Sequence, residues 1–203
     1  MNFILATTNQ GKAREVNSLF GKSYLVKTLA DIGFNDEIVE DGATFAENAV
    51  IKANTIHNHL SRTHLNENLY VLADDSGLVI DALNGEPGVH SARWLGVDTP
   101  YNIKNNKVIE MLADVPEQKR TARFVCAIAC AHPDGQIQTV EGVLEGRIAF
   151  KAAGDNGFGY DPIFFVPNQN CTLAQLNTEE KNRISHRAQA LQQLCCLLGV
   201  NLT

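Results

Sequence analysis

A short apolar run at residues 69–73 is followed at once by Asp74-Asp75-Ser76-Gly77. The run is rich in strand-forming residues, and the apolar segment 78–83 that comes next indicates a second strand. Two adjacent carboxylates repel each other and are costly to bury, so they are most easily kept beside a cation. Mg²⁺ prefers such hard oxygen ligands. The pattern predicts two strands joined by a tight turn that binds metal, although Asp and Gly are also typical of an ordinary turn.

The length and composition fit one globular domain with a sizeable core, because the chain has 203 residues and 44 % apolar content. No apolar run is long enough to cross a bilayer, and the first residues lack the pattern of a signal peptide, so we expect a cytoplasmic protein. The five cysteines indicate neither a disulfide framework nor a zinc site. A net charge of −6 disfavours a nucleic-acid polymer but not a small anionic ligand.

Hydrophobic periodicity predicts an α/β protein. Strands alternate with helices early in the chain and form meanders later, so we expect a mixed sheet with helices packed on it. The expected strands cover 3–6, 24–29, 69–73, 78–83, 121–131, 163–166 and two segments of 137–151 that meet in a turn at Glu145-Gly146. The expected helices run from Lys12 to Phe20, from Thr44 to Leu60 with a capping box of Thr44 and Glu47, from Pro100 to Ala113, and from Ile184 to Leu198.

The segment Thr7-Thr8-Asn9-Gln10-Gly11-Lys12 lies between a predicted strand and a predicted helix. The free N–H groups of a helix start, together with a glycine and a lysine, can hold a phosphate. The spacing is not that of a Walker A loop. Thr, Asn and Gly are equally typical of a turn in which they only cap the helix, so both interpretations stay open.

Lys52 lies within the apolar stripe of the helix predicted over 44–60. A lysine on a buried face must either extend its ammonium group to solvent or meet an anion. Just before this helix, Glu40 and Asp41 supply two carboxylates. They either favour the helix start through its dipole or give a metal ion further oxygen ligands near Asp75.

An aromatic loop with glycines on both sides of Phe158 covers residues 156–162. Glycine lets the backbone approach a flat ligand, on which Phe158 or Tyr160 could stack. Asp161 could accept a hydrogen bond from a ring N–H group. The alternative is a structural turn before the strand predicted at 163–166.

Ser185-His186-Arg187 lies at or near the start of the last predicted helix. If Ser185 caps that helix, His186 and Arg187 lie in its first turn beside free N–H donors. If the helix begins near Asn177, Arg187 lies among apolar residues. In both cases the guanidinium group needs a partner, which carboxylates in the core could supply.

Six separated segments together point to a family. They are 7–12 with Glu15, 40–52, 74–77, Pro87-Gly88 with Ser91-Ala92-Arg93, 158–162 and 185–187. In this order, over nearly the whole chain, they resemble the inosine triphosphate pyrophosphatase family in its bacterial cytoplasmic form. The resemblance implies one α/β domain over residues 1–203 with a long mixed central sheet flanked by helices, two lobes, and an active site in the cleft between them. It also implies a homodimer that requires Mg²⁺.

The reaction implied by the resemblance is hydrolysis of ITP, dITP or XTP to the monophosphate and pyrophosphate, which cleanses the nucleotide pool. Asp75 would be the catalytic base and, with Glu40, would bind magnesium. The loop 7–12 and Lys52 would hold the triphosphate. The nucleoside would be held by Ser76, Phe158, Gly159, Tyr160, Asp161, Lys181, His186 and Arg187. Whether Glu40 or Asp41 meets the metal, and whether Asp74 holds a lysine or a metal-bound water, stays open at this point.

Two other functions are weaker alternatives. A pyrophosphatase for modified pyrimidine nucleotides is disfavoured by the loop 158–161 and by residues 185–187, which resemble the purine-specific family. A sensor that binds a nucleotide without cleaving it is disfavoured by the adjacent carboxylates of Asp74 and Asp75, together with Glu40, because these groups suit hydrolysis.

Overall fold

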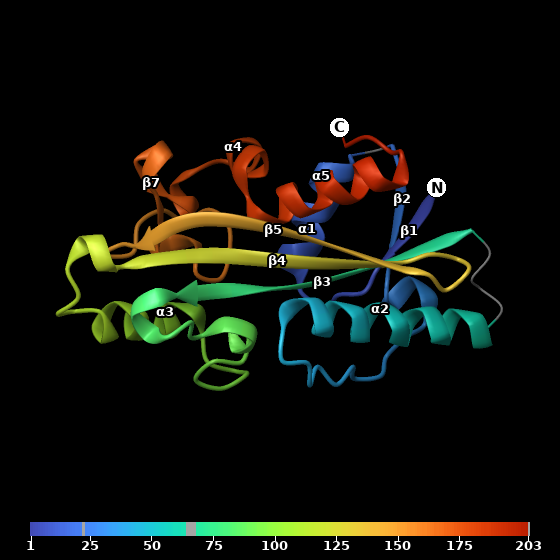
Figure 1. Cartoon of the computed structure of the whole chain (residues 1–203), viewed down its shortest axis with the longest axis horizontal. Coiled ribbons are helices and arrows are strands. Elements are labelled where there is room, and N and C mark those ends of the chain that lie inside the picture. Colours follow the sequence, from blue (N-terminus) through green and yellow to red (C-terminus); the bar gives the residue numbers. More distant parts are fainter. Residues whose placement is uncertain (22, 64–67, 203) are drawn as a thin grey trace. The chain divides into compact units, whose positions relative to one another are not determined.

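A computed structural model describes residues 1–21, 23–63 and 68–202 of the chain, and it confirms the α/β class with a mixed sheet (Figure 1). The sheet has the strand order β2-β1-β3-β4-β5-β6-β7. Its strands are β1 (Asn2–Leu5), β2 (Leu25–Thr28), β3 (Leu69–Ile80), β4 (Thr121–Ala131), β5 (Ile137–Ile148), β6 (Phe164–Val166) and β7 (Cys171–Thr172). The helices are α1 (Gln10–Phe20), α2 (Phe45–Arg62), α3 (Tyr101–Met111), α4 (Thr178–Ile184) and α5 (His186–Leu198). β1 is parallel to β2 and β3, whereas β6 is antiparallel to β5 and β7.

The chain divides into two compact units. Unit 1 comprises Met1–Asp75, Cys126–Gly142 and Arg187–Thr203, and unit 2 comprises Ser76–Val125 and Val143–His186. Strand β3 passes from unit 1 into unit 2 after Asp75, and the last segment of unit 1 begins at Arg187.

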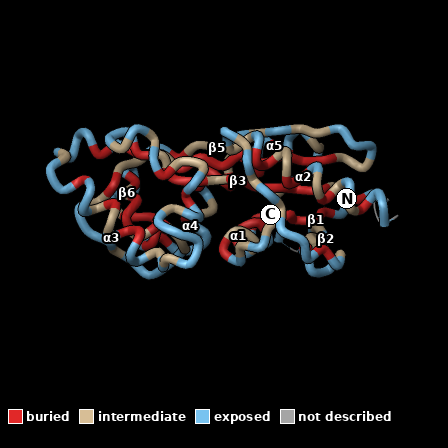
Figure 2. Tube along the Cα trace, turned by 90° about the horizontal axis from the view of Figure 1, so that it is seen from below, coloured by how far each residue is buried: buried red, intermediate tan, exposed pale blue. Residues whose placement is uncertain are grey.

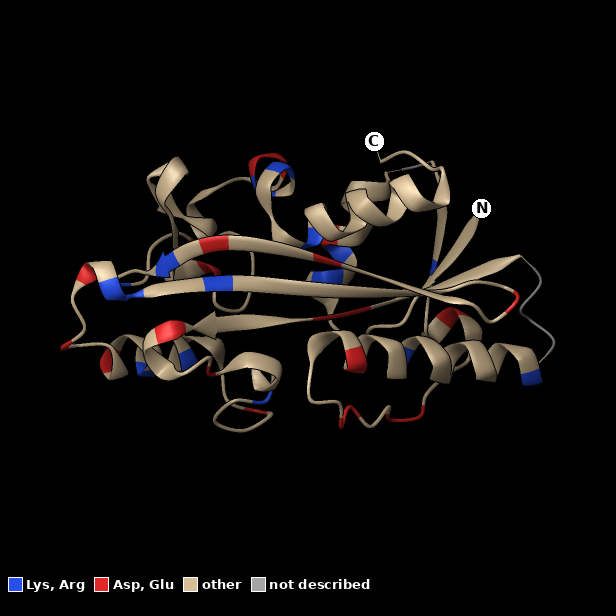
Figure 3. Cartoon of the chain, in the orientation of Figure 1, with Lys and Arg blue, Asp and Glu red and all other residues tan. Residues whose placement is uncertain are grey.

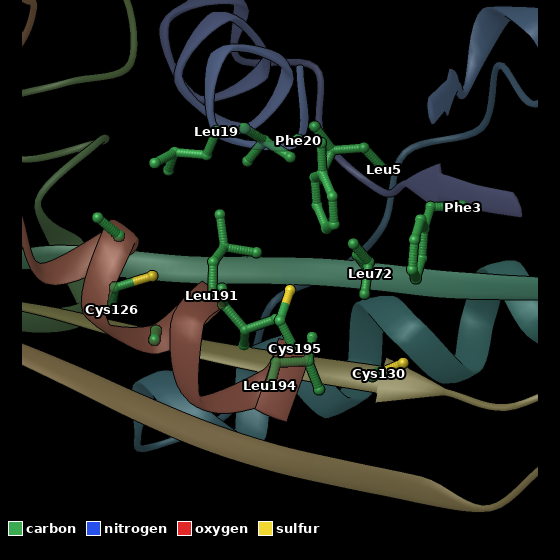
Figure 4. Close-up of a cluster of buried hydrophobic side chains, with 14 residues drawn as sticks. Phe3, Leu5, Leu19, Phe20, Leu72, Cys126, Cys130, Leu191, Leu194 and Cys195 are labelled. Carbon is green, nitrogen blue, oxygen red and sulfur yellow. The ribbon is translucent and has the colours of Figure 1, made fainter. Parts of the chain in front are cut away.

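Strands β1 and β3 of unit 1 bury both of their faces, which Figure 2 shows as buried segments along them. Because side chains alternate across a strand, Phe3 and Leu5 join one core with α1 and α5, while Ile4 joins a second core with α2. In Figure 4, Leu19 and Phe20 of α1 and three residues of α5 point toward the first core. The labelled residues of α5 are Leu191, Leu194 and Cys195. α1 and α5 therefore cover one face of these strands and α2 covers the other.

The core of unit 2 is built from α3, from the second half of β3 and from the segments around β6 and β7. Its aromatic contacts include Phe124 and Phe164, whose ring centroids lie 4.6 Å apart. None of the helices among the described residues has the length and apolar character required to cross a membrane.

The turn predicted at Asp74–Gly77 is wrong, because β3 runs unbroken from Leu69 to Ile80. Both carboxylates have cationic partners inside the fold, so they do not need an exposed turn. The turn predicted at Glu145-Gly146 is wrong as well, since β5 is continuous. A Cβ atom at Gly146 would lie 2.6 Å from the Phe164 ring, which shows that this glycine makes room for a neighbouring side chain.

The helices differ from the prediction in several respects. The last predicted helix is two helices: α4, capped by Asn177, ends at Ile184, and α5 begins at His186 after the extended residue Ser185. α3 begins at Tyr101, one residue after Pro100. The predicted capping box of α2 is half formed, because Thr44 accepts a hydrogen bond from the Glu47 N–H group while the Glu47 carboxylate accepts from Ala43.

We expect the first core to depend on Leu194. Leu194→Ala should lower the free energy of unfolding by about 2–5 kcal/mol, because it leaves a cavity among fully buried side chains. Leu197→Ala on the same helix is the matched control: Leu197 is 59 % exposed and Leu194 0 %. Urea denaturation would measure both. Equal losses for the two variants would contradict the assignment of this helix face to the core.

Candidate active site

Asp74 and Asp75 are neighbours on β3, and their carboxylates meet different partners. Asp74 contacts groups from α1 and α5, whereas Asp75 contacts groups from α2. Successive side chains of a strand point to opposite faces, so the two carboxylates belong to two clusters rather than to one shared metal site.

Asp74 lies in a buried network of charges. Its carboxylate is 2.5 Å from Lys12 Nζ and accepts a hydrogen bond of 2.7 Å from Arg187 Nε. Arg187 also pairs with Glu15, and Cys126 Sγ lies 3.0 Å from the Asp74 carboxylate. Burial alone would raise the pKa of Asp74, but the charges of Arg187 and Lys12 hold it well below its usual value. Asp74 is therefore an ionised group that holds a lysine, one of the two roles left open by the sequence.

Asp75 lies between a lysine and an amide of α2. Its Oδ1 is 3.2 Å from Lys52 Nζ, and its Oδ2 accepts a hydrogen bond of 3.2 Å from Asn48 Nδ2. Lys52 Nζ also contacts Glu40 Oε2 at 2.7 Å. Burial raises the pKa of Asp75, and the nearby Glu40 carboxylate raises it further against the opposing charge of Lys52. Glu40 thus lies beside Asp75, because both carboxylates contact the same ammonium group, whereas Asp41 is exposed.

The two aspartates therefore differ in chemistry. Two carboxyl groups whose surroundings shift their pKa values in opposite directions are suited to different tasks. Asp74, with its lowered pKa, stays charged and fixes the cations around it. Asp75, with its raised pKa, is the better proton acceptor because its pKa is closer to neutral pH.

Glu40 and Asp75 together form a donor set that fits Mg²⁺. Their carboxylates lie on the same ammonium group and offer hard oxygen ligands. Among the residues that the structure describes, no group of three or more His, Cys, Asp or Glu side chains could hold a metal alone. Mg²⁺ commonly binds through one or two protein carboxylates together with substrate phosphates. These residues fit a metal ion that binds with a phosphate ligand, and not one held by protein alone.

The predicted phosphate loop begins α1 with an asparagine cap. Asn9 Oδ1 accepts hydrogen bonds from the N–H groups of Gly11 at 2.9 Å and Lys12 at 3.2 Å. Asn9 N–H donates to Thr7 Oγ1 at 3.1 Å, while Thr8 and Gln10 are exposed. The structure therefore confirms that this segment caps α1. Figure 3 shows charged positions of α1 close to the one basic position at the start of α5, where Arg187 pairs with Glu15.

In unit 2, the loop 158–161 is closed by its own aspartate. Asp161 Oδ2 accepts hydrogen bonds from the Phe158 N–H group at 2.8 Å and from Lys181 Nζ at 2.5 Å. Lys181 Nζ also lies 4.9 Å from the centroid of the Phe158 ring. A Cβ atom at Gly157, whose φ is +74°, would lie 2.1 Å from Asp161 Oδ2. Glycine is required there because this turn closes on the carboxylate.

Tyr160 is buried, whereas Phe158 is only partly covered. The Tyr160 hydroxyl donates to the backbone oxygen of Ser91 at 3.0 Å, and its ring packs edge-on against Tyr101 at 5.2 Å. Of the two aromatic residues predicted to stack on a base, Phe158 has the more accessible ring. His186 stacks on Phe124, with ring centroids 4.8 Å apart and an interplanar angle of 11°.

The sequence interpretation missed the residues of α3 that surround this loop. Lys104 and Asn105 are both buried, and Asn105 Nδ2 donates to the Gly159 carbonyl at 3.1 Å. They share a helix face with Tyr101 and Val108, which lie three or four residues away along the helix. A polar residue within a buried stripe was the observation that selected Lys52, and the same observation could have selected these two.

The chain is similar to known proteins over nearly its whole length. The Ham1 family model matches residues 3–196. A protein of Shouchella clausii named dITP/XTP pyrophosphatase is 49 % identical and covers 94 % of this chain and 93 % of its own length. A Bacillus subtilis protein of the same name is 46 % identical over 96 % of both chains.

Solved structures are similar to this chain in fold. A HAM1 protein from Coxiella burnetii has a TM-score of 0.84, 40 % identity and 98 % coverage of both chains. The fold and the sequence define the same class of α/β protein. The chain belongs to the Ham1 family.

We expect Asp74→Asn to lower the free energy of unfolding by about 3–5 kcal/mol, because it removes one charge from a buried network and leaves its cations under-compensated. The matched control is Asp81→Asn. Asp81 pairs with Arg123 at the surface, so its replacement should cost about 1 kcal/mol or less. Equal effects in chemical denaturation would contradict the structural role of Asp74.

The same pair tests the pKa of Asp74. A carboxyl group with a lowered pKa stabilises the fold above its ordinary pKa of 3.8, and loses that contribution as the pH falls through its lowered value. The stability difference between the wild type and Asp74→Asn should therefore be constant near neutral pH and shrink in acid. A difference that grows as the pH falls would overturn the assigned direction.

Proposed function

We propose that the protein is a Mg²⁺-dependent pyrophosphatase that hydrolyses ITP, dITP and XTP to the nucleoside monophosphate and pyrophosphate. The names of the Ham1 relatives supply the substrate class. The observation that carries the chemistry is the Asp75 carboxylate, which is held by Lys52 and Asn48 and has a raised pKa.

Asp75 acts as the general base. Its two oxygens are fixed by two donors, and a carboxylate held in this way can accept the proton of the water that attacks the α-phosphorus. Glu40 and Asp75 would hold Mg²⁺ together with the substrate, and the metal would supply charge neutralisation at the phosphate oxygens. Lys12 and Lys52 stabilise the departing pyrophosphate, because phosphoryl transfer depends mainly on positioning and charge neutralisation.

The loop at the start of α1, residues 7–12, binds the triphosphate beside these lysines. The nucleoside is held by eight residues from separate segments of the chain. They are Ser76, Phe158, Gly159, Tyr160, Asp161, Lys181, His186 and Arg187. The half-covered Phe158 ring and the Lys181–Asp161 pair support this assignment. Arg187 is already paired with Glu15 and Asp74, so it acts on the base only from within that network.

Selectivity follows from the edge of the base. Hypoxanthine and xanthine carry an oxygen acceptor at position 6, whereas adenine carries an amino donor. A buried donor aimed at this position, such as His186, loses its hydrogen bond with adenine, at a cost of roughly 1–3 kcal/mol for each unmade contact. Several such contacts give strict rejection. Guanine shares the 6-oxo group, so it must be rejected at position 2.

A homodimer and a cytoplasmic location belong to the same proposal. The five cysteines are free thiols, which fits a reducing compartment. Light scattering after size-exclusion chromatography would measure the assembly, and a monomer at micromolar concentration would remove the dimer from the proposal.

The reaction is tested by measuring pyrophosphate release from ITP, dITP, XTP, GTP and ATP, each with and without Mg²⁺. We expect release from the first three only, and only with the metal. Nucleotide binding without any release would favour a sensor. Orthophosphate in place of pyrophosphate would mean that the wrong bond has been assigned.

The base is tested by Asp75→Asn, which keeps the shape of the side chain but removes the proton acceptor. We expect turnover of ITP to fall by about 10²–10⁴-fold while ITP still binds in calorimetry. Asp81→Asn, at a surface aspartate of the same chain region, should keep full activity. Activity close to that of the wild type in Asp75→Asn would overturn the assignment of Asp75.

A further inference from the structure

Asn105 is a polar residue on the buried face of α3. It is 4 % exposed and belongs to unit 2. Its Nδ2 donates a hydrogen bond of 3.1 Å to the carbonyl oxygen of Gly159, which lies in the loop assigned above to the nucleoside. The contact joins residues that are far apart in the sequence, so it ties this loop to a separate helix.

The loop 158–161 depends on such external contacts. Gly157 and Gly159, on either side of Phe158, both have a positive φ, +74° and +69°. Glycine has little conformational preference of its own, so the loop is held by the hydrogen bond from the Phe158 N–H group to Asp161 and by contacts to neighbouring elements. Lys181 of α4 holds Asp161, and Ser91 holds Tyr160. Asn105 holds Gly159, the residue between Phe158 and Tyr160.

The oxygen of the Asn105 amide adds no hydrogen bond to the fold among the described residues. Among the side chains that the structure describes, Asn105 Oδ1 is one of few buried polar atoms without a hydrogen-bond partner. A buried acceptor without a partner costs more free energy than one neutral hydrogen bond contributes. A leucine of similar size would need no hydrogen-bond partner at this position. Among the described residues, the amide therefore makes one hydrogen bond, from Nδ2 to the Gly159 carbonyl, and leaves its oxygen without one.

We propose that Asn105 is a positioning residue for nucleoside recognition. By fixing the Gly159 carbonyl, it holds the backbone of the loop in the conformation in which Phe158 and Asp161 receive the base. This inference rests on the proposed function, because it assumes that the loop binds the nucleoside of the substrate. The chemistry at the phosphates, which involves Asp75 and Lys52, does not include Asn105.

The test compares Asn105→Leu with Asn106→Leu. Both change an asparagine of α3, but Asn106 is exposed. For Asn105→Leu we expect the KM for ITP to rise roughly 3- to 10-fold, the loss that corresponds to one hydrogen bond, while kcat changes less than about twofold. Its midpoint of thermal unfolding should equal or exceed that of the wild type. Asn106→Leu should match the wild type in KM and kcat.

The combination of weaker substrate binding with undiminished stability separates positioning from a structural role. A KM within twofold of the wild type would overturn the inference. So would a lower unfolding temperature, because it would show that the amide serves the fold. If the wild type and Asn106→Leu are both inactive with ITP, the proposed function fails and this inference fails with it. If both are active, an unaffected Asn105→Leu overturns the role of Asn105 alone.

Discussion

The alternation of side chains along β3 is the constraint on which the candidate site depends. Two adjacent aspartates on a strand must point to opposite faces, and each face of this strand is covered by different helices. Asp74 therefore meets Lys12 and Arg187, and Asp75 meets Lys52. A tight turn would have left both carboxylates in solvent with ordinary pKa values. The strand instead gives one carboxyl group a lowered pKa and its neighbour a raised one.

Charge pairing connects this strand to the rest of unit 1. Lys12 lies near the start of α1 and Arg187 near the start of α5, so both helix starts are fixed by the single carboxylate of Asp74. Lys52 lies on α2 and joins Asp75 to Glu40, which precedes that helix. Because a buried charge without a partner is very costly, the arrangement of these helices around β3 and the placement of the charged groups are set together.

The sequence was sufficient to predict the elements with long periodic patterns. It also identified the charged residues that lie within apolar stripes. It predicted α2, Lys52 and the need of Arg187 for core carboxylates. It failed at Asp74–Gly77 and at Glu145-Gly146, where local turn chemistry was overridden by contacts from distant segments. Those contacts, such as the packing of Phe164 over Gly146, join residues far apart in the chain, and a local pattern contains no information about them.

A polar residue on an otherwise apolar helix face is informative in both units for the same reason. Such a residue lowers stability unless a partner compensates for its burial. For Lys52 the compensation is complete, because two carboxylates meet its ammonium group. For Asn105 it is partial, because only Nδ2 is satisfied. Full compensation is compatible with a purely structural role, so the charge on Lys52 does not by itself identify a site. The partial compensation at Asn105 is the observation behind its proposed positioning role.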